Sequence, residues 1–135
     1  MKISFVVDSR RFRILKLDEV PEFSDGIFSI TKDRSEVTVV ASDKADLGET
    51  PEEEKCLKLL TIDAVLPFNL TGFLAYLSHL LAEEKIPIFV ISTYSTDHIF
   101  IKEEFLDRAV EAFERNGLVQ AKPAVAGRKP GRKPQ

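Results

Sequence analysis

Two short polar segments in the second half of the chain hold the residues best suited to bind a ligand. In the first segment, Asn69 and Thr71 stand just before an apolar pattern of helical spacing, and Gly72 follows them. Their side chains can cap a helix, and the free N–H groups and dipole of a helix N-terminus attract an anion such as a carboxylate. Gly72 would let a ligand approach the backbone closely. The same residues are equally expected if they only begin the helix.

The second polar segment is Thr93-Tyr94-Ser95-Thr96-Asp97. Asp97 is a natural counter-charge for an α-amino group, so the two segments together could hold an amino acid. Ser95, Thr96 and Asp97 are also ordinary turn residues, and this structural interpretation is the somewhat stronger one. The ring of Tyr94 could line a pocket or could lie at a contact between two copies of the chain, and the contact is favoured.

Catalytic and metal chemistry have little support in the sequence. Cys56 is the only cysteine, and His79 and His98 are the only histidines. Without a second ligand cluster at metal spacing, both histidines are expected at the surface or at a sheet edge. Cys56 is predicted to be a small packing residue, because no basic partner stands near it in the sequence. No nucleophile elbow, Walker loop, dinucleotide fingerprint or zinc-protease motif occurs. We therefore expect no enzyme, no metal and no cofactor.

Composition and charge indicate a small cytoplasmic protein. The chain has 135 residues, of which 44% are hydrophobic, and this is ample for a buried core. No apolar run approaches the roughly 20 residues of a membrane span, and the first residues do not form a signal peptide. The net charge is −3, and because the segment after Ala121 adds five positive charges and no acid, residues 1–121 carry −8. This acidic body argues against a nucleic-acid surface.

The basic segment at the end of the chain is predicted to be disordered. Residues 120–135 are rich in proline, glycine, lysine and arginine, and they repeat Gly-Arg-Lys-Pro. A flexible basic arm can contact phosphate groups of a nucleic acid. A solubilising or vestigial extension has the same composition and is the favoured interpretation.

The elements of the first half are predicted from apolar, β-branched runs separated by turn residues. Residues 12–17, 27–33 and 36–42 read as strands, with a hairpin turn at Arg34-Ser35. Residues 43–55 read as a polar connector with room for one helical turn. Its three consecutive glutamates, Glu52 to Glu54, are expected to be solvated.

The second half shows a clearer order of strands and helices. Three strands are predicted here, at residues 57–66, 86–91 and 98–101. The last two are expected to form a hairpin. Apolar residues recur with helical spacing from Leu70 to Leu81. A second helix is expected to begin near Glu103, to bury one apolar face and to end at Asn116-Gly117. The half therefore reads β-α-β-β-α, and residues after 119 are expected to be mobile.

The two halves echo each other at an offset of 61 residues. The string IFSITKDRSEVTVVAS aligns with IFVISTYSTDHIFIKE, with identities at Ile27/Ile88, Phe28/Phe89 and Ile30/Ile91. Two apolar hairpins can share three such identities by chance. The same strand-turn-strand order in both halves nevertheless favours a diverged duplication, in which the first half lacks a helix.

The second half resembles an ACT domain. The resemblance rests on the stretch LTIDAVLPFNLTGFLAYLSHLLAEEKIPIFVISTYSTDHIFIKEEFLDRAVEAFERNG, in which an apolar strand leads to Thr71-Gly72, a helix, a strand pair and a second helix. More narrowly, it resembles small bacterial and archaeal ACT proteins related to the paired-ACT arginine sensors of animals. The domains expected from it are a degenerate ACT-like half at 1–50, an ACT domain at 55–119 and the basic tail at 120–135.

The resemblance implies an α+β, ferredoxin-like fold of order βαββαβ, with an antiparallel sheet and the helices on one face. It implies a non-catalytic sensor that binds a small effector, an amino acid, at an ACT–ACT interface within a homodimer, and that acts on a regulatory protein partner. The ligand-binding positions implied are Asn69, Leu70, Thr71, Gly72, Thr93, Tyr94, Thr96 and Asp97. The alternative is an oligomerisation module without a ligand, whose uncovered sheet edges pair with a second copy.

Overall fold

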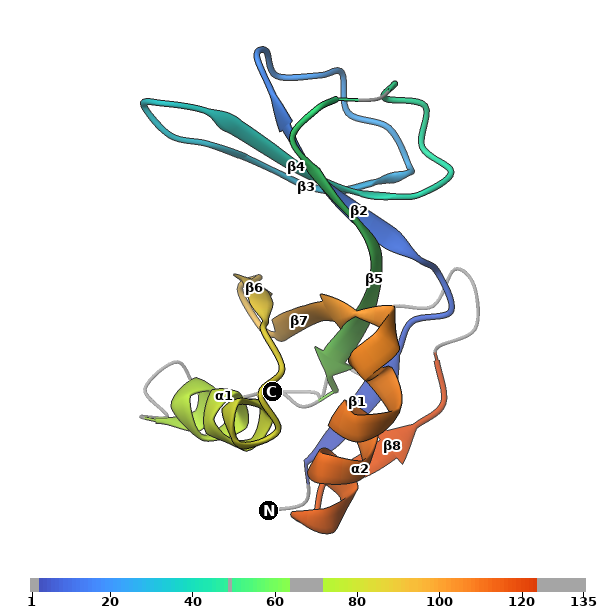
Figure 1. Ribbon diagram of the computed structural model, residues 1–135, viewed down its shortest axis with the longest axis vertical. Coiled ribbons are helices and arrows are strands. Elements are labelled where there is room, and N and C mark those ends of the chain that lie inside the picture. Colours follow the sequence, from blue (N-terminus) through green and yellow to red (C-terminus); the bar gives the residue numbers. More distant parts are fainter. Residues whose placement is uncertain (1–2, 49, 64–71, 124–135) are drawn as a thin grey trace. The chain divides into compact units, whose positions relative to one another are not determined.

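The computed structural model describes residues 3–48, 50–63 and 72–123, which divide into two compact units (Figure 1). The sheet unit is Arg10–Leu57, and the helical unit comprises Met1–Ser9 and Lys58–Gln135. The first nine residues therefore group with the second half of the chain, although the predicted boundary places them in the first. We describe each unit by itself.

Among the described residues of the sheet unit, all regular secondary structure is β-strand. The strands are β2 (Phe12–Leu17), β3 (Ile27–Lys32), β4 (Val37–Ser42) and the first half of β5 (Glu53–Ile62), in the antiparallel order β3-β4-β2-β5. Alternate residues of these strands form a core, with Leu15, Val37 and Val39 at its centre. The three strands predicted in the first half are confirmed.

Asp33 fixes the turn between β3 and β4, at the predicted Arg34-Ser35 position. Its Oδ1 accepts hydrogen bonds from the backbone N–H groups of Ser35 at 2.7 Å and of Glu36 at 2.9 Å. These two donors stabilise the charged carboxylate and lower the pKa of Asp33. The sequence signal for this turn is therefore local side-chain chemistry.

A buried ion pair holds the connector after β4 against the sheet unit. The Arg13 guanidinium lies 3.1 Å from Glu53 Oε2, and the two side chains are only 10% and 7% exposed. Arg13 also donates hydrogen bonds to the carbonyl oxygens of Gly48 at 2.9 Å and Ala45 at 3.1 Å. We expected Glu52, Glu53 and Glu54 to be solvated residues of a connector. This expectation is wrong for Glu53, because its carboxylate balances the buried charge of Arg13.

Strand β5 begins at Glu53, earlier than the predicted start at residue 57. It contains a bulge, because Phe12 pairs with Leu57 whereas Ile14 pairs with Glu54, which leaves one extra residue on β5. Within this bulge Cys56 has the left-handed φ of 60° and an exposed side chain. The prediction that Cys56 is a packing residue is therefore wrong.

The helical unit has the element order βαββαβ. After the second half of β5 come α1 (Phe73–Glu83), β6 (Phe89–Ser92), β7 (Asp97–Lys102), the short 3₁₀ helix η1 (Glu103–Phe105), α2 (Leu106–Arg115) and β8 (Val119–Ala121) (Figure 1). Strand β7 pairs with both β5 and β6. The predicted ferredoxin-like α+β fold is confirmed.

Strand β1 (Ser4–Val7) adds a feature that was not predicted. It pairs with β5 in antiparallel orientation and with β8 in parallel orientation, so the sheet is mixed and not purely antiparallel. The backbone N–H of Val119 donates to the carbonyl of Ile3 at 3.0 Å. Residues 119–121 therefore form a strand, and the expectation of mobility after Val119 is wrong for Gln120 and Ala121.

Both helices bury one apolar face in a common core of the helical unit. Leu77 and Leu81 of α1 and Phe113 of α2 are fully buried, and the Phe113 ring meets Phe5 of β1 edge-on at 5.3 Å. Helix α2 ends at the predicted site, where Gly117 has a φ of 91°. Glycine adopts this conformation without the steric cost that other residues pay.

We expect Arg13→Ala to lower the free energy of unfolding by roughly 3 kcal/mol, because the buried Glu53 carboxylate would keep only Lys55, whose side chain is 58% exposed, as an ion-pair partner. Lys16→Ala is a matched control on the same strand, because Lys16 forms exposed ion pairs with a side chain 46% exposed. Its cost should be clearly smaller, because water and salt screen exposed ion pairs. Urea unfolding measures both, and equal losses would contradict a stabilising role for the buried pair.

Candidate functional site

The β6–β7 turn brings four of the predicted ligand residues together. Ser92 pairs with Asp97, so Thr93 and Thr96 face each other and Tyr94-Ser95 forms the tip. The Thr93 N–H donates to the Thr96 carbonyl at 2.8 Å, and the Thr96 N–H returns a bond of 3.4 Å. This is a tight hairpin, as the sequence predicted.

Side chains reinforce the same turn. The Ser92 hydroxyl donates to Asp97 Oδ1 at 2.6 Å, and the Thr93 hydroxyl donates to the Thr96 carbonyl at 3.2 Å. Asp97 thus has a structural partner whether or not it meets a ligand. Tyr94 is 99% exposed at the tip, so its ring is not part of a pocket formed by the described residues.

His98 contributes a polar centre that the sequence analysis did not assign to the site. Its Nδ1 lies 3.1 Å from the Thr61 hydroxyl of β5, and its Nε2 lies 3.3 Å from the Thr93 hydroxyl of the turn. Burial lowers the pKa of His98, and the neighbouring Asp97 carboxylate offsets part of this effect. The expectation of an edge histidine missed these contacts because Thr61 is far away in the sequence.

Gly72 occupies the N-cap position of α1. Its φ of 82° is left-handed, no side chain caps the helix, and its carbonyl accepts the N–H of Tyr76 at 2.9 Å. Helix α1 therefore begins after Gly72 and not at Leu70, and the N-cap position does not belong to Asn69 or Thr71. Asn69, Leu70 and Thr71 lie outside the described residues.

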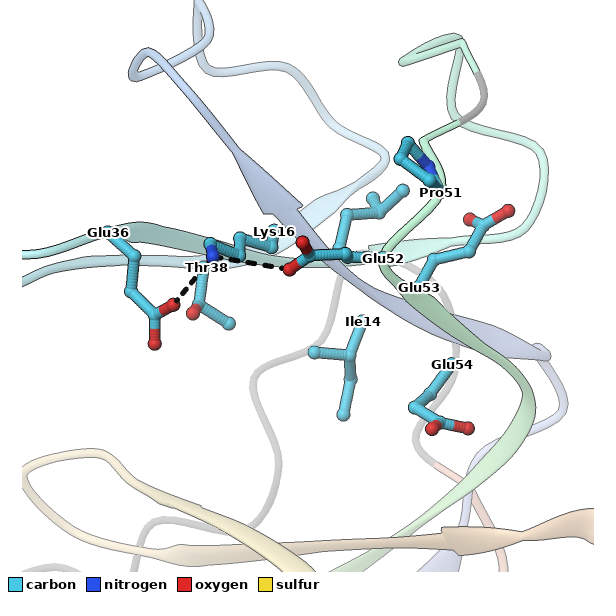
Figure 2. Close-up of a pocket in the computed structure, with 9 residues that line it drawn as sticks. Ile14, Lys16, Glu36, Thr38, Pro51, Glu52, Glu53 and Glu54 are labelled. Carbon is cyan, nitrogen blue, oxygen red and sulfur yellow. Dashed lines mark ion pairs between the residues drawn. The ribbon is translucent and has the colours of Figure 1, made fainter.

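A second candidate is an open depression of about 340 Å³ on the sheet unit, between β4, β2 and β5 (Figure 2). Figure 2 shows the Lys16 ammonium between two carboxylates, 3.7 Å from Glu36 and 3.2 Å from Glu52. Ile14 and Thr38 also line it, together with Leu15, Pro51, Glu53 and Glu54. The hydrogen bond and charge of Glu52 raise the pKa of Lys16.

The charged side chains that line the depression pair with one another, which makes it a weak candidate for a binding pocket. Its one lysine already lies between two acids, and within the described ranges no group of His, Cys, Asp and Glu side chains is arranged to hold a metal ion. Strand alternation puts Ile14 and Lys16 on one face, but only the pairing with β4 and β5 brings the acids to them. The turn of the helical unit is therefore the stronger candidate site.

Comparison with known families places this turn in a defined domain. Residues 52–115 match the family model of the ACT domain. The match covers β5, both helices and the β6–β7 hairpin. The resemblance of the second half to an ACT domain is therefore confirmed for residues 52–115.

Solved structures show the same fold at low sequence identity. A protein from Agrobacterium tumefaciens superimposes with a TM-score of 0.77 at 18% identity, covering 96% of this chain and 99% of that one. A Vibrio cholerae protein of unknown function gives 0.67 at 22% identity, covering 86% and 88%. The regulatory subunit of aspartate kinase from Thermus thermophilus, in its ligand-free form, gives 0.59 at 12% identity, covering 82% and 94%.

No protein with a curated description matches the chain. Across the described residues, neither helix has the length and apolar content needed to cross a bilayer.

We expect Gly72→Ala to destabilise the protein by about 1 kcal/mol, because alanine pays a steric cost at a left-handed φ. Nothing lies within 4 Å of the position of an added Cβ, so backbone strain and not a clash sets the effect. Gly72→Asn is the matched control and should lose less, since asparagine tolerates this conformation. Chemical denaturation distinguishes them, and a neutral Gly72→Ala would contradict the assigned conformation.

Proposed function

We propose that this protein is a non-catalytic, cytoplasmic sensor that binds a small effector, an amino acid, at an interface between two ACT units. The observation that carries the proposal is the β6–β7 turn of a chain segment that matches the ACT family. Binding there would change the association of two copies or the fit of a partner protein. The narrower relation to arginine sensors stays a prediction.

The chemistry around the proposed site fits the two ends of an amino acid. Asp97 supplies a carboxylate for the α-amino group. Helix α1 carries no acidic residue in its first turn and no side-chain cap, so its N–H groups and dipole are suited to the ligand carboxylate. The other proposed ligand contacts are Asn69, Leu70, Thr71, Gly72, Thr93, Tyr94 and Thr96.

The proposal predicts that one amino acid raises the melting temperature in a screen of the twenty amino acids, because it binds only the folded state. At a ligand concentration 100 times the Kd, the stabilisation is about 2.7 kcal/mol. Asp97→Ala should remove this response, whereas Glu114→Ala, an exposed acid on α2, should retain it. A response that survives Asp97→Ala would contradict the site, and no response to any amino acid would contradict the effector class.

The second candidate function is a ligand-free assembly module. It is favoured by apolar side chains that are exposed in a single copy, since Tyr94 is 99% and Phe89 36% exposed. Both belong to the β6–β7 hairpin, and in the described ranges β6 pairs only with β7, so one edge of β6 offers backbone groups to another strand.

For this second function we expect the purified protein to form a dimer without added ligand, and Tyr94→Ser with Phe89→Ser to shift it toward monomer. Light scattering after size exclusion measures the mass over a dilution series. Tyr76→Ser, which changes an exposed tyrosine of α1, is the matched control. A protein that is monomeric at all concentrations would exclude this function.

A further inference from the structure

The solvent side of α2 carries a stripe of four acids. Glu104 lies in η1 directly before α2, and Asp107, Glu111 and Glu114 follow at spacings of three, four and three residues. Residues at these spacings lie on one side of a helix. All four are exposed, and we call them the acidic face of α2.

Most of the charge on the acidic face is not balanced within the described residues. The two arginines of α2 are held at the end of α1, because Arg108 donates to the Glu84 carbonyl and Arg115 lies 3.2 Å from the Glu84 carboxylate. Arg115 also lies 3.4 Å from Glu111. The other three acids of the face form no ion pair with another described residue.

The chain after α2 turns back along the helix. The turn at Asn116-Gly117 leads into β8, which contacts α2 and runs in the opposite direction (Figure 1). Strand β8 therefore directs the residues after Ala121 toward the N-terminal end of α2, where Glu104 and Asp107 lie.

The sequence after β8 is basic throughout. Residues 122–135, which we call the basic segment, contain five lysine and arginine residues and no acid, and residues 124–135 lie outside the described structure. The repeat Gly-Arg-Lys-Pro places the pairs Arg128-Lys129 and Arg132-Lys133 four residues apart. Each pair precedes a proline, and a residue before proline favours an extended backbone.

The spacing of these cation pairs matches the spacing of the acids. Four residues of an extended, proline-rich chain span about 12 Å. On α2, the acid pair Glu104/Asp107 and the acid pair Glu111/Glu114 are seven residues apart, which corresponds to about 10 Å along the helix axis. Residues 122–127 reach up to about 20 Å, which leaves enough chain for the segment to turn back onto the helix.

Other acids of the described chain fit the repeat less well. The loop between β2 and β3 contains no cation, but its four acids lie on no helix or strand that would space them evenly; they are Asp18, Glu19, Glu22 and Asp25. The acids at the depression of the sheet unit are already shared with Lys16. The acidic face of α2 is therefore the surface that the charge repeat favours, and it belongs to the same unit as the basic segment.

We propose that residues 127–134 bind along the acidic face of α2, with one Arg-Lys pair at each acid pair. The occupant is the segment of the same chain, because β8 directs it toward this helix. Exposed ion pairs are individually weak, so the contact needs several pairs at once and opens at high salt. While it is bound, the basic segment is withheld from the phosphate groups of a nucleic acid. This inference does not depend on the proposed effector.

The test is paramagnetic relaxation NMR on the full chain. Cys56→Ser removes the only cysteine, and a nitroxide is then attached after Gln135→Cys. The amide signals of α2 should lose intensity in 0.1 M salt and regain it in 1 M salt, because the screening length falls from about 10 Å to about 3 Å. Unchanged α2 signals in 0.1 M salt would overturn the proposal.

Two double variants of equal charge locate the contact. Asp107→Asn with Glu114→Gln removes one acid from each pair of the acidic face and should abolish the loss of intensity. Glu22→Gln with Asp25→Asn is the matched control on the β2–β3 loop and should retain it. The dispersed spectrum of each variant shows that it is folded. A loss that survives the α2 variant, or that disappears in the loop variant, would contradict the assigned surface.

A mixing experiment identifies the source of the segment. Nitrogen-15-labelled protein without a nitroxide is mixed with unlabelled protein that carries the nitroxide. Binding within one chain predicts no loss of α2 intensity in the labelled protein. A loss as large as that within the spin-labelled chain would assign the contact to the segment of a second copy and overturn the proposal.

Discussion

Backbone hydrogen bonding along β5 is the constraint on which both units depend. Its first residues pair with β2 in the sheet unit, and its last residues pair with β1 and β7 in the helical unit. Unpaired backbone groups are costly when buried, so the buried second half of this strand depends on its neighbouring strands for hydrogen-bond partners. The register of β5 against β2 shifts at the bulge that contains Cys56, next to the boundary between the units after Leu57.

Each unit adds a different means of stabilisation to this strand. The sheet unit has a small core, and it buries an Arg13–Glu53 pair whose guanidinium also binds two connector carbonyls. A charge pair of this kind favours one arrangement of the connector, because any other would leave a buried ion without its partner. The helical unit has a larger apolar core, to which both helices contribute, and Phe5 and Phe113 are among its fully buried side chains.

The β6–β7 hairpin holds its shape with the same few residues that are proposed to bind a ligand. Ser92, Thr93, Thr96 and Asp97 bond to one another, and the His98 ring connects the turn to β5. Residues that hold a turn in shape can also present donors and acceptors to a ligand, which is why neither interpretation of the sequence excluded the other. A rigid strand pair that carries an exposed turn is a common way to place binding groups precisely without a deep cavity.

Local patterns in the sequence determined much of this protein. Strands β2, β3 and β4, the β6–β7 hairpin and both helices follow from apolar spacing and turn residues, which act over a few positions. The end of α2 follows from Gly117, and the resemblance to the ACT family added a last strand to the order β-α-β-β-α. Only the tertiary structure decided that β1 enters between β5 and β8, that Glu53 is buried, and that His98 meets Thr61. These features join residues far apart in the chain, and their energies come from pairing and burial that no local pattern records.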